Sequence, residues 1–462
     1  MERTLVNGIG EHEGKEVVLM GWVAVRRDHG KIIFIDLRDR SGIAQCVFIA
    51  KNAETYAVAE TLRPEWVIKL TGTVSKRPES MVNPDTLNGA WEVKATAIEI
   101  LNQAETPPIA IDTDGYDIGE EHRLKYRYLD LRRERLQANL RLRHEVIAHM
   151  RDYLNDRDFV EVETPIISKA TPEGARDYLV PSRVYPGKSY ALPQSPQQYK
   201  QLLMTAGLER YYQFARCFRD EDTRGDRQPE FTQLDLEMSF VKQEDVINLM
   251  ESLYIDTITT LLPEKKIQQI PFPRITYKEA MEKYQSDKPD IRTDKNDPNL
   301  LAFCWVIDFP FFEKTDKGDW TFTHNPFSSA QPEHAENLRK KENIGGILAA
   351  QYDLALNGYE IGGGSIRNHK PEDLRTVLEI MGYDEARITE SCGHMLEAFA
   401  YGTPPHGGIA MGIDRLLAIV ANEPNIREVI AFPKTGDARD LMMDAPSPLA
   451  KSQLDEVGLQ LK

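Results

Sequence analysis

The sequence predicts a multidomain α+β protein, in which a small N-terminal β-barrel is joined by a hinge to a larger body where helices flank an antiparallel sheet. Three observations predict this class. The length of 462 residues suits two or three domains. Short alternating runs separated by turns fill residues 15–100, as in an all-β unit. Beyond residue 119, longer helical patterns mix with strands and lack the regular alternation of a parallel sheet.

Composition and charge narrow the class of protein further. Hydrophobic residues make up 41% and charged residues 28% of the chain, an ordinary balance for a folded protein. The net charge of −16 argues against a protein that coats DNA non-specifically, because such binding needs cations against phosphates. The chain starts without a signal segment, and its longest strong apolar run, 416–421, is far shorter than the ~20 residues of a membrane span. We therefore expect a cytoplasmic protein that has no membrane partner.

The cysteines and histidines show neither a disulfide framework nor a zinc site. Cys46, Cys217, Cys304 and Cys392 lie far apart without a CxxC pair, and the ten histidines form no cluster with metal-ligand spacing. We expect the cysteines to be buried as small hydrophobic residues.

Five predicted strands near the N-terminus suit a small barrel. They cover residues 17–26, 31–38, 43–49, 66–74 and 91–100. A helical stretch at about 52–62 falls between the third and fourth strands, where a five-stranded oligonucleotide-binding barrel, the OB-fold, places its helix.

One face of the second predicted strand carries an aromatic ring among charges. Phe34 shares the polar face with Asp36 and Arg38, and Arg27 and Lys31 are near it in sequence. A flat ring and nearby cations suit the stacking of single-stranded bases. A second small core behind Phe34 is the alternative, and the strand pattern alone leaves both open.

A segment rich in Pro, Asp, Thr and Gly at 104–119 predicts a linker. We therefore expect a barrel domain at 1–105, a hinge at 106–130 and a body at 131–462. Within 122–151 there are nine Lys or Arg residues against three acids, which suits either a nucleic-acid surface or a solvated helix face. A helix is predicted at about 137–155, followed by a strand at 159–162.

A long hairpin at 211–240 carries the richest set of polar groups. Alternation predicts an apolar back of leucines and methionine behind a polar front. That front comprises Gln213, Arg219, Glu221, Phe231, Gln233, Asp235 and Glu237. It can bind a phosphate, a purine ring and an amine together. The alternative is a hairpin with a purely structural role, whose polar groups form salt bridges on its surface.

Two glycine-rich segments follow further along the chain. In 359–367 three consecutive glycines allow close backbone approach, while Glu360 could hold a cation and Arg367 could hold a carboxylate. In 406–415 a glycine-flanked strand runs into an apolar helix and places Arg415 near the helix start, a favourable position for anionic phosphate. Neither segment matches the GxGxxG or GxxxxGK[ST] spacing.

Residues 159–165, 218–237 and 408–415 resemble motifs one, two and three of the class II aminoacyl-tRNA synthetases, in order and at suitable separations. The segments 171–178, 194–200 and 358–367 resemble the bacterial type of the aspartyl-tRNA synthetase family. The resemblance covers nearly the whole chain, barrel included. It implies an OB-fold barrel that binds the anticodon and a catalytic domain built on an antiparallel sheet with flanking helices.

The resemblance also implies the reaction and the partners. The α-carboxylate of L-aspartate attacks the α-phosphate of ATP, pyrophosphate leaves, and the acyl group then passes from the adenylate to the 3′ end of tRNA(Asp). No covalent enzyme intermediate is needed, which agrees with the lack of a nucleophile motif, because positioning and charge neutralisation can supply this catalysis. The family further implies Mg²⁺ and a homodimer.

Roles for individual residues follow from the same resemblance. It assigns catalysis to Arg219, Arg415 and Glu360. It assigns ATP binding to Arg219, Asp220, Glu221, Gln228, Phe231, Glu360, Gly412, Ile413, Asp414 and Arg415. It assigns aspartate binding to Glu173, Gln197, Lys200, Asp235, His324 and Arg367, and Mg²⁺ binding to Asp353 and Glu360. Asn325 stands where the family usually has a second histidine.

In the barrel, the matching tRNA-reading positions are Arg27, His29, Phe34, Gln45, Arg77 and Glu92. Relatives with His at position 29 tend to charge both tRNA(Asp) and tRNA(Asn), whereas Leu tends to accompany strict enzymes. We therefore hypothesise that this chain also charges tRNA(Asn). The barrel region carries 13 basic and 15 acidic residues, so most of the negative charge lies in the body.

The chain departs from the bacterial type in one large respect. Bacterial relatives carry an additional domain between motifs two and three, whereas here only the short stretch 287–303 connects them. Two alternatives to an active aspartate enzyme remain open, an inactive synthetase-like tRNA-binding protein and an asparaginyl-tRNA synthetase.

Overall fold

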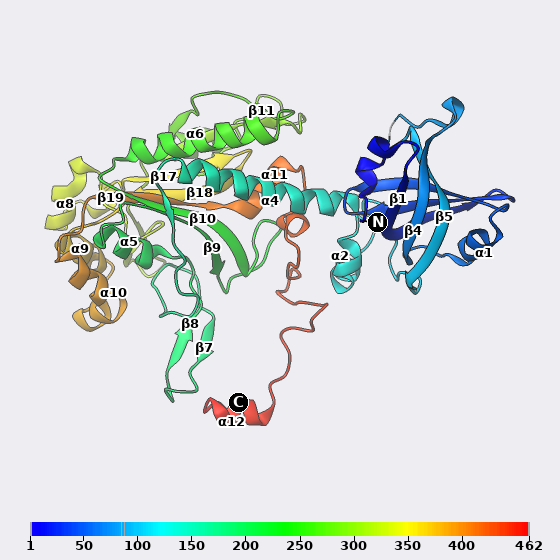
Figure 1. Ribbon diagram of the computed structural model, residues 1–462. Helices are drawn as coiled ribbons and strands as arrows, with labels where there is room; N and C mark the ends of the chain where they lie inside the picture. The colour runs from blue at the N-terminus through cyan, green and yellow to red at the C-terminus, as the bar shows by residue number, and fades with distance from the viewer. Residues whose placement is uncertain (1, 85, 87, 461–462) are drawn as a thin grey trace. The chain divides into compact units, whose positions relative to one another are not determined.

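A computed structural model describes residues 2–84, 86 and 88–460, and the chain divides into two compact units, Met1–Thr113 and Asp114–Lys462 (Figure 1). The predicted fold class is confirmed, because the first unit is a closed barrel and the second combines a large sheet with helices.

The first unit is a five-stranded closed barrel with the order β1-β2-β3-β5-β4. Its strands are β1 (Glu16–Asp28), β2 (Ile32–Asp39), β3 (Gly42–Ile49), β4 (Val67–Lys76) and β5 (Trp91–Asn102), with helix α1 (Ala53–Thr61) between β3 and β4 and 3-10 turns at Val6–His12 and Glu79–Met81. All five predicted strands and the predicted helix are present. Alternate residues of β2 point inward, so Ile33, Ile35 and Leu37 are buried while Phe34 stays half-buried on the outer face.

The second unit is built on an eight-stranded sheet with the order β12-β14-β17-β18-β19-β10-β9-β6. Its strands are β6 (Val160–Glu161), β9 (Arg210–Phe218), β10 (Glu230–Ser239), β12 (Arg274–Thr276), β14 (Phe303–Ile307), β17 (Gln351–Leu356), β18 (Tyr359–Ile366) and β19 (His406–Gly412). The inner pairs are antiparallel as predicted, but the outermost pairs, β6 with β9 and β12 with β14, are parallel. A parallel pair needs a long crossover, and both edge strands join their neighbours through segments that contain a helix.

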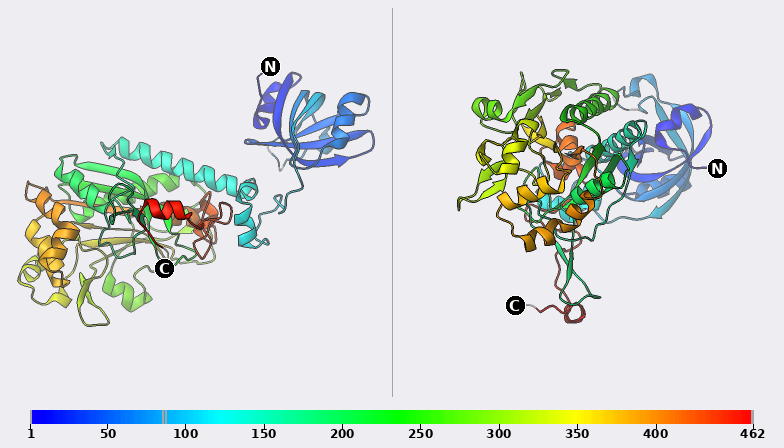
Figure 2. Two further views of the ribbon diagram at one scale, coloured as in Figure 1. Left: turned by 90° about the horizontal axis from the view of Figure 1, so that it is seen from below. Right: turned by 90° about the vertical axis from the view of Figure 1, so that its left-hand side faces the viewer.

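Helices cover this sheet and enclose the main core. α4 (Glu134–Asn155), α6 (Gln243–Leu261) and α11 (Ile413–Val420) bury apolar side chains in one cluster with β10, β17, β18 and β19. Figures 1 and 2 show α4 and α6 along the sheet, and Figure 1 shows α5 (Gln197–Thr205) on the side away from α6. In the predicted stripe of α4, Val146, Met150 and Tyr153 are buried and Leu142 packs against the cluster.

Smaller elements complete the second unit. The helices are α2 (Glu120–Lys125), α3 (Arg127–Asp130), α7 (Tyr277–Tyr284), α8 (Ala335–Lys340), α9 (Pro371–Ile380), α10 (Glu385–Phe399) and α12 (Lys451–Glu456), with 3-10 turns η3 (Pro332–His334), η4 (Ile344–Gly346) and η5 (Ile426–Val429). The two-stranded sheets pair β7 (Leu179–Pro181) with β8 (Ser189–Ala191), β15 (Phe312–Lys314) with β16 (Trp320–Phe322), and β11 (Lys266–Ile267) with β13 (Leu300–Leu301). In Figures 1 and 2 the β7–β8 hairpin and the chain leading to α12 project from the body.

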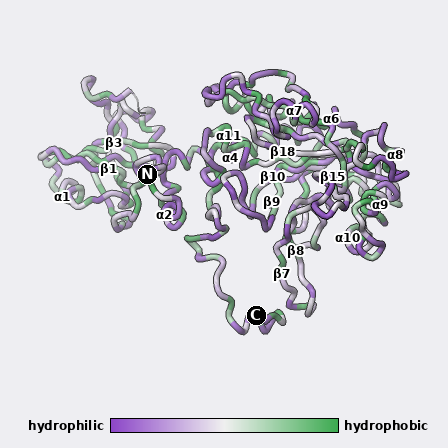
Figure 3. Tube along the Cα trace, turned by 180° about the vertical axis from the view of Figure 1, so that it is seen from behind, coloured by the Kyte–Doolittle hydropathy of each residue, from purple (hydrophilic) through white to green (hydrophobic). Residues whose placement is uncertain are grey.

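Hydrophobic residues are distributed in short stretches along the trace (Figure 3). Within the described part of the chain, no helix has the length and apolar character that crossing a membrane requires. All four cysteines are free and buried, as predicted.

The basic stretch 122–151 is largely paired inside the second unit. Asp130 is fully buried and receives ion pairs from Arg123, Arg127 and Arg133, while Glu428 of η5 binds Arg123 at 2.6 Å. Burial alone would raise the pKa of Asp130, but the ion pairs with these arginines lower it. Residues 120–130, predicted as part of the hinge, therefore form α2 and α3 and join the body through a buried charge cluster.

Replacing Asp130 should destabilise the second unit strongly. Asp130→Ala leaves three buried guanidinium groups without their shared carboxylate, so we expect a loss of about 3–5 kcal/mol in the free energy of unfolding. Glu336→Ala, which removes an exposed pair with Lys340, is the control and should change it by less than ~1 kcal/mol. Urea unfolding of both variants measures the difference, and equal midpoints would contradict a structural role for the cluster.

Candidate functional site

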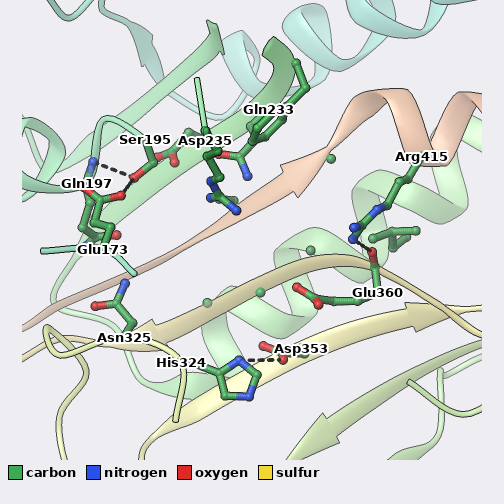
Figure 4. A pocket seen from close by; sticks show the side chains of 18 of the residues that line it. Glu173, Ser195, Gln197, Gln233, Asp235, His324, Asn325, Asp353, Glu360 and Arg415 are labelled. Carbon is green, nitrogen blue, oxygen red and sulfur yellow. Dashed lines mark hydrogen bonds and ion pairs between the residues drawn. The ribbon is translucent and has the colours of Figure 1, made fainter. Parts of the chain in front are cut away.

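A cavity of about 320 Å³ lies in the second unit, and it is lined by residues of the predicted hairpin 211–240 and of both glycine-rich segments, 359–367 and 406–415. Its walls come from α5, from the strands β10, β17, β18 and β19, and from the start of α11. In Figure 4 Glu173, Gln197 and Asp235 lie at one end, whereas Glu360 and Arg415 lie at the other. Segments more than 200 residues apart in sequence therefore form one polar chamber.

Two buried cations share a buried carboxylate at the first end. Lys200 Nζ lies 2.8 Å from Asp235 Oδ1 and 3.2 Å from Glu237 Oε2, and Arg367 Nε lies 3.0 Å from Glu237 Oε1. All four side chains are at most 3% exposed. Burial alone would raise the pKa of Glu237, but Arg367 and Lys200 lower it, so Glu237 stays ionised.

The sequence pattern of β10 explains this arrangement. Asp235 and Glu237 are two residues apart, so both side chains leave the same face of the strand. In the register with β19, Glu237 lies opposite Gly408, where an added Cβ would collide with the Glu237 carboxylate. A glycine at this position therefore leaves space for the carboxylate beside Arg367.

The other residues predicted to bind the amino-acid substrate surround the same end of the cavity. Glu173 accepts hydrogen bonds from Ser195 Oγ at 2.5 Å and Thr171 Oγ1 at 2.9 Å, and burial raises its pKa. Gln197 lines the cavity from the first turn of α5. The ring of His324 packs edge-on against Phe309, and burial lowers its pKa.

Two carboxylates, those of Asp353 and Glu360, face the middle of the cavity (Figure 4). Burial raises the pKa of Asp353, and the negative charge of Glu360 adds to this effect. Gly363 lies against the pair, because an added Cβ would be 2.7 Å from Asp353 Oδ1. The described residues contain no group of three His, Cys, Asp or Glu side chains arranged to hold a metal. The carboxylate pair suits Mg²⁺ only if other oxygens complete its coordination.

Arginines dominate the second end of the cavity. The guanidinium of Arg219 lies over the ring of Phe231, with its carbon 5.1 Å from the ring centroid. Arg415 donates to the carbonyl oxygen of Glu360 at 2.7 Å and forms an ion pair with Asp226 at 3.2 Å. Two cations, an aromatic face and polar loop residues suit a nucleotide with its phosphates.

Several residues predicted to bind ATP have other partners or positions. Both polar atoms of the Gln228 amide bind the backbone of Lys434, and Glu221 pairs with Arg227. Gly412 lines the cavity at the end of β19. Of the remaining residues, Asp220 is exposed outside the cavity, Ile413 is buried in the core, and Asp414 lines the cavity but pairs with Arg143 and the Thr232 amide.

The barrel carries a second candidate site on its outer face. The Arg27 guanidinium binds Asp36 at 2.6 and 2.8 Å, and its Nη2 also donates to Gln45 at 3.5 Å. Gln45 in turn donates to Glu92 at 3.4 Å, so one polar row crosses β1, β2, β3 and β5. Beside it, the rings of His29 and Phe34 meet edge to face at 5.6 Å, and Arg77 Nε binds the Trp91 carbonyl oxygen.

Three further residues of these sites received no individual role from the sequence, although Glu237 was named on the polar front of the hairpin. Glu237 holds both cations, Asp226 holds Arg415, and Asp36 holds Arg27. Glu237 and Asp36 each lie two residues from a predicted site residue on the same strand face, which was the available signal. Nothing in the sequence indicated the pairing of Asp226, because a loop residue has no periodicity to place it.

Replacing Glu237 should reduce stability most at neutral pH. Glu237→Gln keeps the shape but removes the carboxylate that pairs with Arg367 and leaves Lys200 with Asp235 alone, so we expect a loss of about 3–5 kcal/mol in the free energy of unfolding at pH 7. Because the folded pKa of Glu237 is lowered, its contribution is present above the unfolded pKa of about 4.3 and disappears as the pH falls further.

Urea unfolding at pH 7, 5 and 3.5 tests this dependence. Glu244→Gln, which removes an exposed carboxylate from α6, is the matched control and should have little effect at any pH. A loss for Glu237→Gln that is the same at pH 7 and pH 3.5 would contradict the expectation.

The chain matches two known families. The model described as "tRNA synthetases class II (D, K and N)" matches residues 119–436, and the model described as "OB-fold nucleic acid binding domain" matches residues 17–101. Among curated relatives, the aspartate–tRNA(Asp/Asn) ligase of Rubrobacter xylanophilus is 42% identical, over 97% of this chain and 95% of the relative. The protein of that name from Legionella pneumophila strain Philadelphia 1 is 40% identical, over 97% and 96%.

The alignments also show a difference in length. The first of them runs over 572 positions, whereas 97% of this chain is about 448 residues, so about 124 aligned positions face no residue of this chain. This difference agrees with the predicted lack of an additional domain.

Solved structures share the fold over nearly the full chain. Asparaginyl-tRNA synthetase from Pyrococcus horikoshii, complexed with asparaginyl-adenylate, covers 94% of this chain and 98% of its own at a TM-score of 0.76 and 24% identity. Aspartyl tRNA synthetase from Entamoeba histolytica covers 94% and 91% at a TM-score of 0.72 and 22% identity, and at such identities both show the fold alone. Given the family match over two thirds of its residues and its curated relatives, the chain belongs to the class II tRNA synthetases of the D, K and N group.

Proposed function

We propose that this chain is an aspartate–tRNA ligase, which uses ATP to activate L-aspartate and then charges tRNA. The observation that carries the proposal is the pair of buried cations, Lys200 and Arg367, at one end of a cavity whose other end presents Arg219 and Arg415. The names of the curated relatives support the same activity.

In the activation step, an oxygen of the aspartate α-carboxylate attacks the α-phosphorus of ATP, and pyrophosphate leaves with the electrons of the broken bond. Arg219 holds the α-phosphate and Arg415 the γ-phosphate, while Phe231 stacks beneath the purine. A terminal ribose hydroxyl of tRNA then attacks the acyl carbon, and AMP leaves. Fixed cations placed where phosphate charge develops need no reorganisation during the step, which is the source of the rate enhancement.

Asp353 and Glu360 would hold Mg²⁺ together with phosphate oxygens and water. The chemistry of the donor set fits this ion, because two carboxylates on adjacent strands face the same polar cavity. When bound, Mg²⁺ supplies positive charge that offsets the phosphates.

At the amino-acid end, Lys200 and Arg367 bind the side-chain carboxylate, and Glu173, Gln197 and Asp235 accept hydrogen bonds from the ammonium. An asparagine amide in place of the carboxylate would leave a buried cation without its partner, which is costly. His324 lies beside Asp353 and closes this side of the cavity.

The tRNA partner is proposed from the barrel. The polar row of Arg27, Gln45 and Glu92, with Phe34 and His29 beside it, supplies hydrogen-bonding groups and a stacking ring for anticodon bases. We infer that tRNA(Asp) and also tRNA(Asn) are substrates. We also infer a homodimer in the cytoplasm, to which exposed apolar side chains such as Val160 on the edge strand β6 would contribute.

Replacing Arg367 tests the amino-acid assignment. We expect aspartate-dependent exchange of pyrophosphate with ATP in the wild type, and a loss of at least about 30-fold in kcat/KM for aspartate in Arg367→Leu. Arg375→Leu removes an exposed arginine of α9 and should leave the exchange unchanged. Exchange that depends on asparagine instead would indicate an asparaginyl enzyme, and no exchange with either amino acid would indicate an inactive tRNA-binding protein.

Replacing His29 tests the choice of tRNA. We expect the wild type to aspartylate transcripts of both tRNA(Asp) and tRNA(Asn), and His29→Leu to reduce charging of tRNA(Asn) at least about fivefold more than that of tRNA(Asp), because one lost hydrogen bond is worth about that factor. His12→Leu in the same unit is the control and should affect neither. Equal losses on both tRNAs, or a wild type that charges only tRNA(Asp), would overturn the relaxed specificity.

A further inference from the structure

A chain of hydrogen bonds runs from the first residue of β19 to the wall of the amino-acid end. His406 Nδ1 lies 2.8 Å from the carbonyl oxygen of Pro404, and His406 Nε2 lies 3.0 Å from the amide nitrogen of Gln201. Gln201 Oε1 accepts a hydrogen bond of 2.9 Å from the amide nitrogen of Gln197. His406 and Gln201 are fully buried and Gln197 is 4% exposed, so water cannot replace these partners.

The Pro404 end of this series of hydrogen bonds fixes the direction of every hydrogen bond in the series. The Pro404 carbonyl can only accept, so the hydrogen of the neutral ring is on Nδ1 of His406. Burial lowers the pKa of His406, which keeps the ring neutral and leaves Nε2 as an acceptor; Glu237 acts in the opposite direction, and Arg367 and His369 act in the same direction as burial.

An acceptor at Nε2 orients both glutamines. The amide NH₂ of Gln201 must point toward His406, so its Oε1 points toward Gln197. The NH₂ of Gln197 is then used by Gln201, and its Oε1 is left for the cavity that Gln197 lines. An ammonium group can only donate hydrogen bonds, so this orientation presents the atom that such a group needs.

Helix α5 is also attached by contacts outside this series of hydrogen bonds. The Thr205 and Thr403 hydroxyls lie 2.7 Å apart, and Gln198 Oε1 lies 2.8 Å from His394 Nε2. These contacts tie the same helix to neighbouring segments, yet none of the four residues lines the cavity. His394 is therefore a matched control, a histidine that also binds a glutamine of α5 but does not reach the site.

We propose that His406 is a positioning residue for the amino-acid substrate, which acts through Gln201 to hold the Gln197 carbonyl toward the substrate ammonium. The proposal rests on the proposed function, because it takes aspartate as the molecule at this end of the cavity. Without His406, Gln201 and Gln197 can rotate their amides, and an NH₂ group would then face the ammonium.

Aspartate-dependent pyrophosphate exchange with His406→Leu and Gln201→Leu tests the proposal. We expect KM for aspartate to rise about tenfold in each variant, with KM for ATP unchanged and kcat changed less than threefold. His406→Gln, whose side-chain carbonyl can accept from Gln201, should recover most of the affinity. His394→Leu should leave KM for aspartate unchanged.

Succinate, which lacks the ammonium group, separates positioning from a general loss of the pocket. Its inhibition constant against aspartate should be the same in wild type and His406→Leu, because the hydrogen bonds from His406 through Gln201 orient only the group of Gln197 that faces the ammonium. A wild-type KM in both Leu variants, or a succinate constant that rises as much as KM for aspartate, would overturn the proposal while leaving the proposed function intact. A wild type without aspartate-dependent exchange would overturn the proposed function and this inference with it.

Discussion

The amino-acid end of the cavity depends on Glu237, a fully buried carboxylate that lies between two buried cations. Without it, the buried cations Lys200 and Arg367 would lose the carboxylate that they share and would repel each other. Its position depends in turn on the register of β10 with β19, which places it opposite a glycine. The sheet register therefore determines the charge balance at this end of the cavity, where Glu237 already neutralises the two cations in part.

At the second end of the cavity, which carries Arg219 and Arg415, an arginine is likewise paired with a carboxylate of the protein. Arg415 is paired with Asp226, a residue of the loop between β9 and β10, and the same loop contacts η5 through the backbone of Gly225 and Ile426. A phosphate that binds Arg415 competes with a carboxylate already present. The loop is thus connected by charge to the helix that carries Arg415, and by a backbone hydrogen bond to η5, whose Glu428 binds Arg123 of α2 and Arg135 of α4.

Much of the fold could be predicted, because its signals are local. Alternation along β2 and β10 indicated which side chains share a face, and glycine runs indicated where strands approach each other closely. The same alternation placed Asp235 beside Glu237 but could not show that Arg367, 130 residues away from Glu237, would bind it. The contact of Gln201 with His406 spans 205 residues and has no local signal. The basic stretch 122–151 suggested an open surface, whereas three of its arginines converge on a buried aspartate.

The short connection between α7 and β14 is integrated into the second unit. Gln268 binds the backbone at Ile291 and Thr293, Lys265 binds the carbonyl oxygen of Pro298, and Asn357 binds that of Leu300. These hydrogen bonds hold both ends of the segment against neighbouring strands. The connection therefore closes the chain between α7 and β14 without an additional domain, while β13 pairs with β11 and β14 lies within the large sheet.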